Sequence, residues 1–248
     1  MGTENLFHKR KAKAQQDLKR RAPKWASYDK VLIVCEGGKT EPNYFNELKD
    51  YYELDSANVR ISGECGSDPM SVVKYGKKLY EEERRKGDAY DRVYFVFDRD
   101  THATYSAALN AIAASSPKGV FHSITSIPCF EYWVLLRFDY TTAPFSATEA
   151  ASPCDSVIGR LKEYWPEYVK ASKNTFSRLL DKLGFAKANA ERALSEANRN
   201  GTDSPSTYIH ELVHYLQNIK DKLAKTPSST TAPATPTTSP RNCPASPP

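Results

Sequence analysis

Four short strand-patterned segments alternate with helix-patterned segments in the first half of the chain, and this alternation restricts its fold more than any other feature. They cover residues 31–35, 59–61, 92–97 and 120–126 and contain β-branched and aromatic residues, as is typical of strands. The segments between them carry apolar residues at helical spacing. Strands that alternate with helices pair in parallel, and the helices cover the faces of the sheet. The sequence therefore predicts an α/β fold, with a parallel β-sheet flanked by helices.

Capping signals place the starts of two of these helices. Thr40 is expected to cap the first helix, whose opening turn contains Pro42. Asp68 is expected to cap the second, which has Pro69 at its first position. A third helix is expected over residues 103–113.

The segment 128–138 is strongly apolar and aromatic. We expect it to form a helix that packs on the sheet and has Glu131 near its N-terminus. Aromatic side chains at helical spacing usually belong to a core, so Phe130, Trp133 and Phe138 are interpreted as packing residues.

Beyond residue 140 the periodicity is only helical. After a loop rich in threonine, alanine and proline, helices are expected at residues 155–164, 175–183, 187–198 and 206–223. These helices suggest an α-helical C-terminal extension, followed by a Thr/Ser/Pro-rich tail that cannot bury enough apolar surface to fold. The sequence thus predicts a basic N-terminal arm, an α/β domain, a helical extension and a disordered tail, at residues 1–27, 28–140, 141–224 and 225–248.

Composition restricts the cellular setting. The chain of 248 residues contains no apolar run long enough to span a membrane, and no apolar segment follows the basic N-terminus as a secretory signal would require. The five cysteines are scattered without CxxC spacing, which favours a reducing compartment over a disulfide framework. We therefore expect a cytoplasmic protein with no membrane contact; whether it forms a homodimer stays open.

Acidic residues follow two of the expected strands. Glu36 ends the first strand and Glu41 follows after a glycine turn, whereas Asp98 and Asp100 come directly after the strand at 92–97. The carboxyl ends of parallel strands meet at the ligand-binding edge of such a sheet. Carboxylates that close repel one another unless a hard cation lies among them, so we expect a Mg²⁺ or Mn²⁺ site, with Glu131 as a further ligand. The alternative for each is an ordinary polar role, capping a turn or complementing a helix dipole.

Basic residues suggest contacts with nucleic acid. Lys39 precedes a helix start, where backbone amides favour phosphate, and the extension turns basic around Lys170 and Lys173. The net charge is +5, and the N-terminal arm is strongly basic. Its candidate phosphate contacts are Lys9, Arg10 and Lys11. The alternative for the arm is a solvated tail. His102, two residues after Asp100, is interpreted as a surface histidine.

A second enzyme class must be considered. His210-Glu211-Leu212-Val213-His214 matches the HExxH pattern of zinc proteases, in which two imidazoles on one helix face bind the metal. No histidine or glutamate follows to supply a third ligand, and the apolar face of that helix leaves the histidines on its flank. The zinc-protease reading is therefore the less favoured alternative.

The chain resembles the RloB family, whose front half is similar to the Toprim domain of topoisomerases, primases and small nucleases. The resemblance rests on four runs, which together reach from about residue 31 to 216: Ile33–Phe45, Val96–Asp100, Pro128–Glu131, and Pro205–Thr207 ahead of His210. The family usually has asparagine before the Pro-Cys-Phe-Glu run, and here Ile127 stands in its place, which removes a polar role from that position.

The resemblance implies a Toprim-type enzyme that cleaves phosphodiester bonds with one or two divalent ions. Glu36, Asp98 and Asp100 would be its catalytic residues, with Glu36 either a ligand or the general base. It further implies a role in anti-phage defence with a partner ATPase from the same locus. A different class remains open, in which the chain binds nucleic acid without cleaving it or regulates such an ATPase, and metal-dependent cleavage distinguishes the two.

Overall fold

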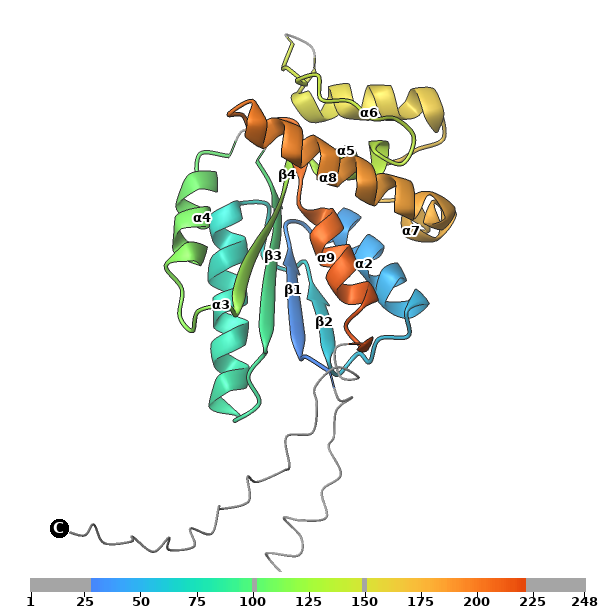
Figure 1. The fold of residues 1–248 in the computed structure, drawn as a ribbon. Coiled ribbons are helices and arrows are strands. Elements are labelled where there is room, and N and C mark those ends of the chain that lie inside the picture. The colour runs from blue at the N-terminus through green and yellow to red at the C-terminus, as the bar shows by residue number, and fades with distance from the viewer. Residues whose placement is uncertain (1–27, 100–101, 149–150, 222–248) are drawn as a thin grey trace, which may run out of the picture.

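The structure is a computed structural model that describes residues 28–99, 102–148 and 151–221 (Figure 1). The basic arm, with Lys9, Arg10 and Lys11, and the C-terminal tail lie outside the described residues, as does Asp100. None of the described helices is long and apolar enough to cross a membrane.

Within the described residues the sheet has five strands in the order β2-β1-β3-β4-β5. The first four pair in parallel and the fifth runs antiparallel to β4, which confirms the predicted α/β fold. The strands are β1 (Val31–Cys35), β2 (Val59–Ser62), β3 (Arg92–Asp98), β4 (Phe121–Ile127) and β5 (Ser206–Thr207).

Helices cover both faces of the sheet and its upper end (Figure 1). Helices α3 and α4 lie on one face, α2 and α9 on the other, and α5, α6 and α8 lie beyond the carboxyl ends of the parallel strands. The helices are α2 (Thr40–Tyr51), α3 (Pro69–Arg85), α4 (Tyr105–Ala113), α5 (Phe130–Leu135), α6 (Pro153–Tyr164), α7 (Thr175–Arg178), the 3₁₀ turn η1 (Leu180–Lys182), α8 (Leu183–Arg199) and α9 (Ile209–Gln217).

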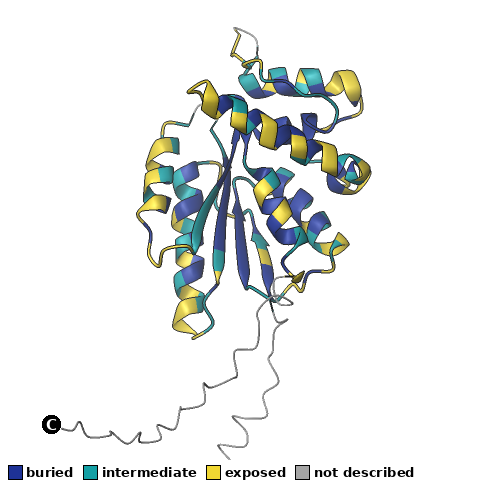
Figure 2. Ribbon diagram, viewed as in Figure 1, coloured by how far each residue is buried: buried dark blue, intermediate teal, exposed yellow. Residues whose placement is uncertain are grey.

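Strand β1 shows why its sequence is a continuous apolar run. Successive side chains of a strand point to opposite faces, and both faces of this sheet are covered. Val31, Ile33 and Cys35 therefore enter the core beneath α2 and α9, whereas Leu32 and Val34 enter the core beneath α3 and α4. Figure 2 shows the central strands buried along their length, while the helices expose their outer sides.

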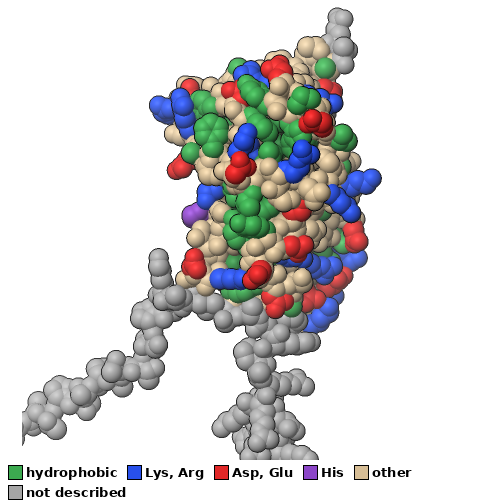
Figure 3. Space-filling view, turned by 90° about the vertical axis from the view of Figure 1, so that its right-hand side faces the viewer, with side chains coloured by type: hydrophobic (Ala, Val, Ile, Leu, Met, Phe, Trp, Pro, Cys, Tyr) green, Lys and Arg blue, Asp and Glu red, His purple; other side chains and the backbone are tan. Residues whose placement is uncertain are grey.

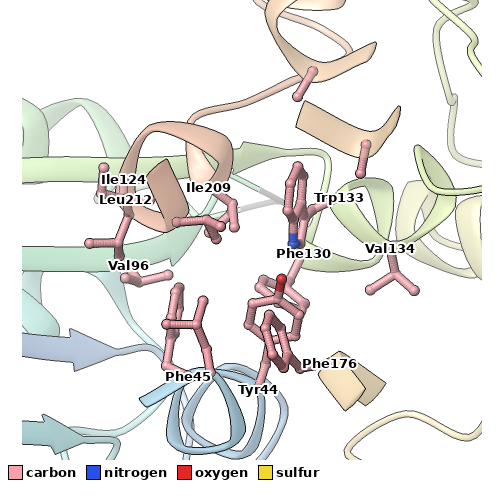
Figure 4. Close-up of a cluster of buried hydrophobic side chains, with 14 of the residues drawn as sticks. Tyr44, Phe45, Val96, Ile124, Phe130, Trp133, Val134, Phe176, Ile209 and Leu212 are labelled. Atoms are coloured by element: carbon pink, nitrogen blue, oxygen red, sulfur yellow. The ribbon is translucent and has the colours of Figure 1, made fainter. Parts of the chain in front are cut away.

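An aromatic cluster joins α2 and α5 to the C-terminal part of the chain (Figure 4). Tyr44 packs edge-on against Phe130 and Phe176, with ring centroids 5.3 and 5.4 Å apart. Trp133 is fully buried beside them, so Phe130 and Trp133 are core residues as predicted, whereas Phe138 is only partly buried.

The same core contains the guanidinium of Arg137, which is 1% exposed. It donates to the Tyr44 hydroxyl at 2.6 Å and to the backbone oxygen of Trp133 at 3.1 Å. A buried cation needs such partners, because burial removes its hydration.

The C-terminal part differs from its prediction in two segments. The helix expected at 206–223 is the short strand β5 followed by α9, and the helix expected at 175–183 is divided into α7 and η1. A two-residue strand is too short to show alternation, so periodicity reported only the helix that follows it. One apolar core includes residues of β1, α2, α8 and α9, so the extension packs directly on the α/β sheet.

The helix starts give one confirmation and one correction. Asp68 caps α3 as predicted, because its carboxylate accepts from the backbone amide of Ser71 at 3.0 Å. Thr40 does not cap α2: it is the first helical residue, and Lys39 is the N-cap without a side-chain bond. The chain enters this helix one residue earlier than the composition suggested.

Candidate functional site

The carboxyl ends of β1 and β3 place Glu36 beside Asp98. Cys35 is paired with Val96 in the parallel register, and the amide of Glu36 donates to the Val96 oxygen at 2.8 Å. The Glu36 carboxylate turns back toward β3 and accepts from the backbone amide of Asp98 at 3.0 Å. The two acidic residues predicted from separate strands are therefore held together by the sheet.

His102 lies against the second oxygen of Glu36. Its Nε2 is 2.9 Å from Glu36 Oε1, and the imidazole is 29% exposed. The sequence had suggested a surface histidine. The pairing of His102 with Glu36 depends on the three-dimensional structure. In the sequence, the one signal for a role of His102 in the site is that it lies two residues after Asp100.

Two glycines allow the β1–α2 turn to place Glu41 at this edge. Gly37 has φ +76°, a left-handed conformation that side chains disfavour. Gly63 follows β2 and passes so close to this turn that an added Cβ would lie 2.2 Å from the Gly37 oxygen. The tight approach leaves Glu41, which is 8% exposed, in the first turn of α2 facing the ends of β1 and β3.

These residues line one cavity of about 640 Å³. The predicted residues that it contains are Glu36, Glu41, Asp98, Lys39 and Lys170, together with His102. Lys39 and Lys170 are exposed residues, although the ammonium of Lys170 lies 3.7 Å from the buried Glu131 carboxylate. Lys173 is also exposed but does not line the cavity.

Burial and the negative charges of neighbouring carboxyl groups raise the pKa values of Glu41 and Asp98 in the cavity. Burial raises the pKa of Asp98 well above its usual range, and the charge of Glu41 raises it further. Burial likewise raises the pKa of Glu41 to about 8, with the charge of Glu131 adding to the effect. Without a cation, the site therefore favours protonated carboxyl groups.

Glu131 is fully buried at the start of α5 and does not line the cavity. Its carboxylate accepts from the Tyr168 hydroxyl at 3.3 Å and lies 3.4 Å from the Cys154 sulfur. Lys170 Nζ is 3.7 Å from Glu131 Oε1. The structure thus places Glu131 behind the cavity, among groups from α6 and the loop that follows it.

Helix α2 holds the loop that carries Lys170. The Asn43 side chain donates to the Ala171 oxygen at 3.0 Å, and the Glu47 carboxylate accepts from the amides of Phe176 and Ser177 at 3.0 and 3.2 Å. These contacts cap α7 and fix the loop against the start of the α/β domain. Burial lowers the pKa of Lys170, but the charges of Glu131, Cys154, Cys129 and Asp98 together outweigh it, and the net shift is upward.

The donor set fits a hard divalent cation. Glu36, Glu41 and Asp98 supply only carboxylate oxygens, which Mg²⁺ and Mn²⁺ prefer, and a cation would relieve their mutual repulsion. Among the residues that the structure describes, no three of these carboxylates have oxygens within 4.8 Å of one another. The three side chains therefore share one cavity, but they would have to move closer to one another to coordinate a single ion.

The HExxH residues are not assembled as a zinc site. His210 Nδ1 lies 3.0 Å from the Thr207 oxygen, and His214 lies beside Asn218 of its own chain segment. In the described part of the chain, neither histidine belongs to a group of three candidate ligands. The protease alternative therefore receives no support from the geometry.

Charges on the face shown in Figure 3 are mixed. Lysine and arginine side chains alternate with aspartate and glutamate over this face. A surface that follows a nucleic acid backbone is usually of one sign. The described residues of this face therefore offer no extended surface of one sign, whereas Lys39 and Lys170 are the candidate phosphate contacts that line the cavity.

One comparison with known proteins gives a match. A family model described as RloB-like protein matches residues 31–216, which is most of the chain and includes every element from β1 to α9 except Gln217, the last residue of α9. No curated protein and no solved structure matches the chain.

Proposed function

We propose that this chain, which belongs to the RloB-like protein family, is a Mg²⁺- or Mn²⁺-dependent nuclease that hydrolyses phosphodiester bonds of DNA or RNA. The observation that carries the proposal is the convergence of Glu36, Asp98 and Glu41 on one cavity beside His102. These residues come from the carboxyl ends of the neighbouring parallel strands β1 and β3 and from the first turn of α2, which follows β1; such strand ends are where α/β folds bind ligands. The resemblance to Toprim domains points to the same chemistry.

Glu41 and Asp98 are the proposed ligands of the cation, with Asp100, which lies outside the described residues, as a further ligand. When bound, Mg²⁺ or Mn²⁺ activates water and stabilises the charge of the leaving oxygen in phosphodiester cleavage. The raised pKa values of Glu41 and Asp98 in the metal-free protein support this assignment, because groups that must share a cation repel one another without it.

Glu36 and His102 are the proposed proton-transfer pair. The Glu36 carboxylate holds His102 Nε2 at 2.9 Å, which fixes the ring in the cavity wall and leaves its other nitrogen to take or give a proton. Glu36 also accepts from the Asp98 amide, so it orients both neighbours. This contact favours an orienting role for Glu36 over that of a free general base.

Lys39 and Lys170 are the proposed phosphate contacts. Both line the cavity and are exposed, and they come from opposite parts of the chain. The positive charge of these two lysines would attract the polyanionic substrate to an otherwise acidic cavity. Lys173, which does not line the cavity, remains a proposed contact, as do Lys9, Arg10 and Lys11, which lie outside the described residues.

The cellular role that we propose is cytoplasmic anti-phage defence with a partner ATPase, on the resemblance stated above. An unregulated nuclease would damage its own cell, so the activity is expected to require the partner or infection. Plaque counts on cells that carry the locus with wild type or Asp98→Asn test the role: the variant should lose protection. Rapid cleavage by purified wild type alone at physiological Mg²⁺ would contradict the regulation.

The proposed chemistry is tested by cleavage of labelled plasmid, single-stranded DNA and total tRNA. The protein is assayed with Mn²⁺, Mg²⁺ or EDTA, alone and with its partner ATPase. Cleavage should require the metal and should fall by at least about a hundredfold in Asp98→Asn. The matched control is Glu211→Gln, an equivalent change on α9 away from the cavity, and His210→Ala tests the protease alternative; both should retain cleavage. Metal-dependent cleavage that Asp98→Asn retains refutes the assignment.

A further inference from the structure

Two thiols and a carboxylate meet behind the cavity. Cys129 and Glu131 stand at the start of α5, and Cys154 stands in the first turn of α6, so the three come from segments on either side of the 141–152 loop. One ligand atom of each lies within 4.8 Å of the others, and all three residues are buried. Among the described residues, this is the one group of three candidate ligands that is so close.

The spacing agrees with the edges of a tetrahedral zinc site. Zinc binds thiolate sulfur at about 2.3 Å and carboxylate oxygen at about 2.0 Å, so a sulfur and an oxygen on one tetrahedral zinc are roughly 3.5 Å apart. Cys154 Sγ and Glu131 Oε2 are 3.4 Å apart. This pair, which forms a hydrogen bond in the metal-free protein, thus already stands at a coordinating separation, and the other pairs lie within 4.8 Å.

A cationic group already lies against these ligands. Lys170 Nζ is 3.7 Å from Glu131 Oε1 and 3.8 Å from Cys154 Sγ. Lys170 also lines the cavity, so its side chain lies between the cavity and this group. The site thus attracts positive charge, and a small ion would replace the lysine as its counterion.

We propose that Cys129, Glu131 and Cys154 form a binding site for a soft divalent cation, Zn²⁺ in the first place, separate from the oxygen-only cavity. Soft thiolate ligands select zinc over magnesium, whereas carboxylates alone favour magnesium or manganese, so ligand type sorts the two ions. A solvent molecule or the Tyr168 hydroxyl, which lies 3.3 Å from Glu131, completes four-coordination. Binding replaces two thiol protons, which are released to solvent.

The position of the site defines its effect. An ion there links the start of α5, which follows β4 of the sheet, to α6 of the C-terminal extension. It also takes over the charge that Lys170 neutralises, which releases this lysine toward the cavity. Zinc occupancy is therefore expected to stabilise the contact between the two parts of the chain.

Cobalt provides the test, because Co²⁺ replaces Zn²⁺ and shows an intense near-ultraviolet band when thiolates bind it. Co²⁺ and then Zn²⁺ are titrated into the metal-free full chain in the presence of excess Mg²⁺. We expect a sulfur-to-cobalt band that Zn²⁺ abolishes, one zinc per chain by mass spectrometry, and release of about two protons per zinc ion. Absence of the band in the wild type overturns the proposal.

Variants assign the ligands. Cys154→Ser and Glu131→Gln should each weaken zinc binding by more than about tenfold, whereas Cys65→Ser, the same change at a cysteine outside the group, should leave it unchanged. Glu41→Gln should also retain the band, which separates this site from the proposed nuclease site. Circular dichroism establishes that each variant is folded. If a variant does not fold, the number of protons that the wild type releases on binding zinc still tests the proposal. A band that survives Cys154→Ser, or release of fewer than about one proton, refutes the assignment.

Discussion

Replacement of Glu41 by glutamine should stabilise the metal-free protein, and increasingly so as the pH rises. Glutamine keeps the shape of the side chain but cannot ionise. The carboxyl of Glu41 is buried among other acids, and its pKa is raised from 4.5 to about 8. A group with a raised folded-state pKa contributes stability below the unfolded value, here 4.5, and that stability is lost as the pH rises through about 8.

The magnitude follows from these two values. Each pH unit between them corresponds to about 1.4 kcal/mol, so full ionisation of Glu41 costs roughly 5 kcal/mol in the isolated limit. Between about pH 5 and pH 7 the loss amounts to about 2 kcal/mol, because part of the charge is shared with Asp98 and Glu131. For a chain of 248 residues this corresponds to roughly 4–8 °C in melting temperature.

The assay is thermal unfolding of both proteins in EDTA at a series of pH values. The variant and the wild type should melt together near pH 5 and separate by about 4–8 °C at pH 7, with the variant higher. The exposed Glu82→Gln is the matched control and should follow the wild type. Added Mn²⁺ should restore the wild type and leave Glu41→Gln unchanged, because a ligand stabilises only the state that binds it. A variant less stable than the wild type at every pH would refute the reasoning.

Three further predictions concern other parts of the fold. Tyr44→Phe removes one of the two acceptors of the buried Arg137 and should destabilise the protein by about 1–3 kcal/mol in urea unfolding, and unchanged metal binding would show that the effect is confined to the core. Gly63→Ala should destabilise the fold, because the added methyl would lie 2.2 Å from the Gly37 oxygen, and a melting temperature equal to that of the wild type would show that the turn can move. Hydrogen bonds from two lysines lower the pKa of Glu83 to about 2, so its stabilising effect is present above about 4.5 and is lost toward pH 2. The stability difference between Glu83→Gln and wild type should therefore shrink as the pH falls through this window, and a difference that is constant with pH would contradict it.

The α/β fold was predictable because its central strands are buried on both faces. Strand β1 sends alternate residues into two different cores, so all five of its residues must be apolar and the run stands out from the sequence. Strand β5 was missed for the opposite reason. It has two residues and forms only because Thr207 and Ser206 reach the edge of β4 through tertiary contacts.

The candidate site also combines residues that the sequence predicts with contacts that it does not predict. Glu36 and Asp98 were predictable because each directly follows a strand, and the strand register alone brings them together. The pairing of His102 with Glu36 depends on the path of a loop, which periodicity does not report. The meeting of Cys129 with Cys154 likewise joins residues with no metal-binding spacing, through the packing of α5 against α6.

A crystal of the full chain soaked in Mn²⁺, with anomalous diffraction recorded at the manganese edge, tests the central claim most directly. We predict an anomalous peak in the cavity between the β1 and β3 ends, with oxygens of Glu41 and Asp98 within about 2.3 Å of the ion. The same soak of Asp98→Asn crystals should give a markedly weaker peak. A cavity without manganese in the wild type, with Glu36 still bonded to His102 and the Asp98 amide, would contradict the metal site and favour a structural role for the acidic cluster.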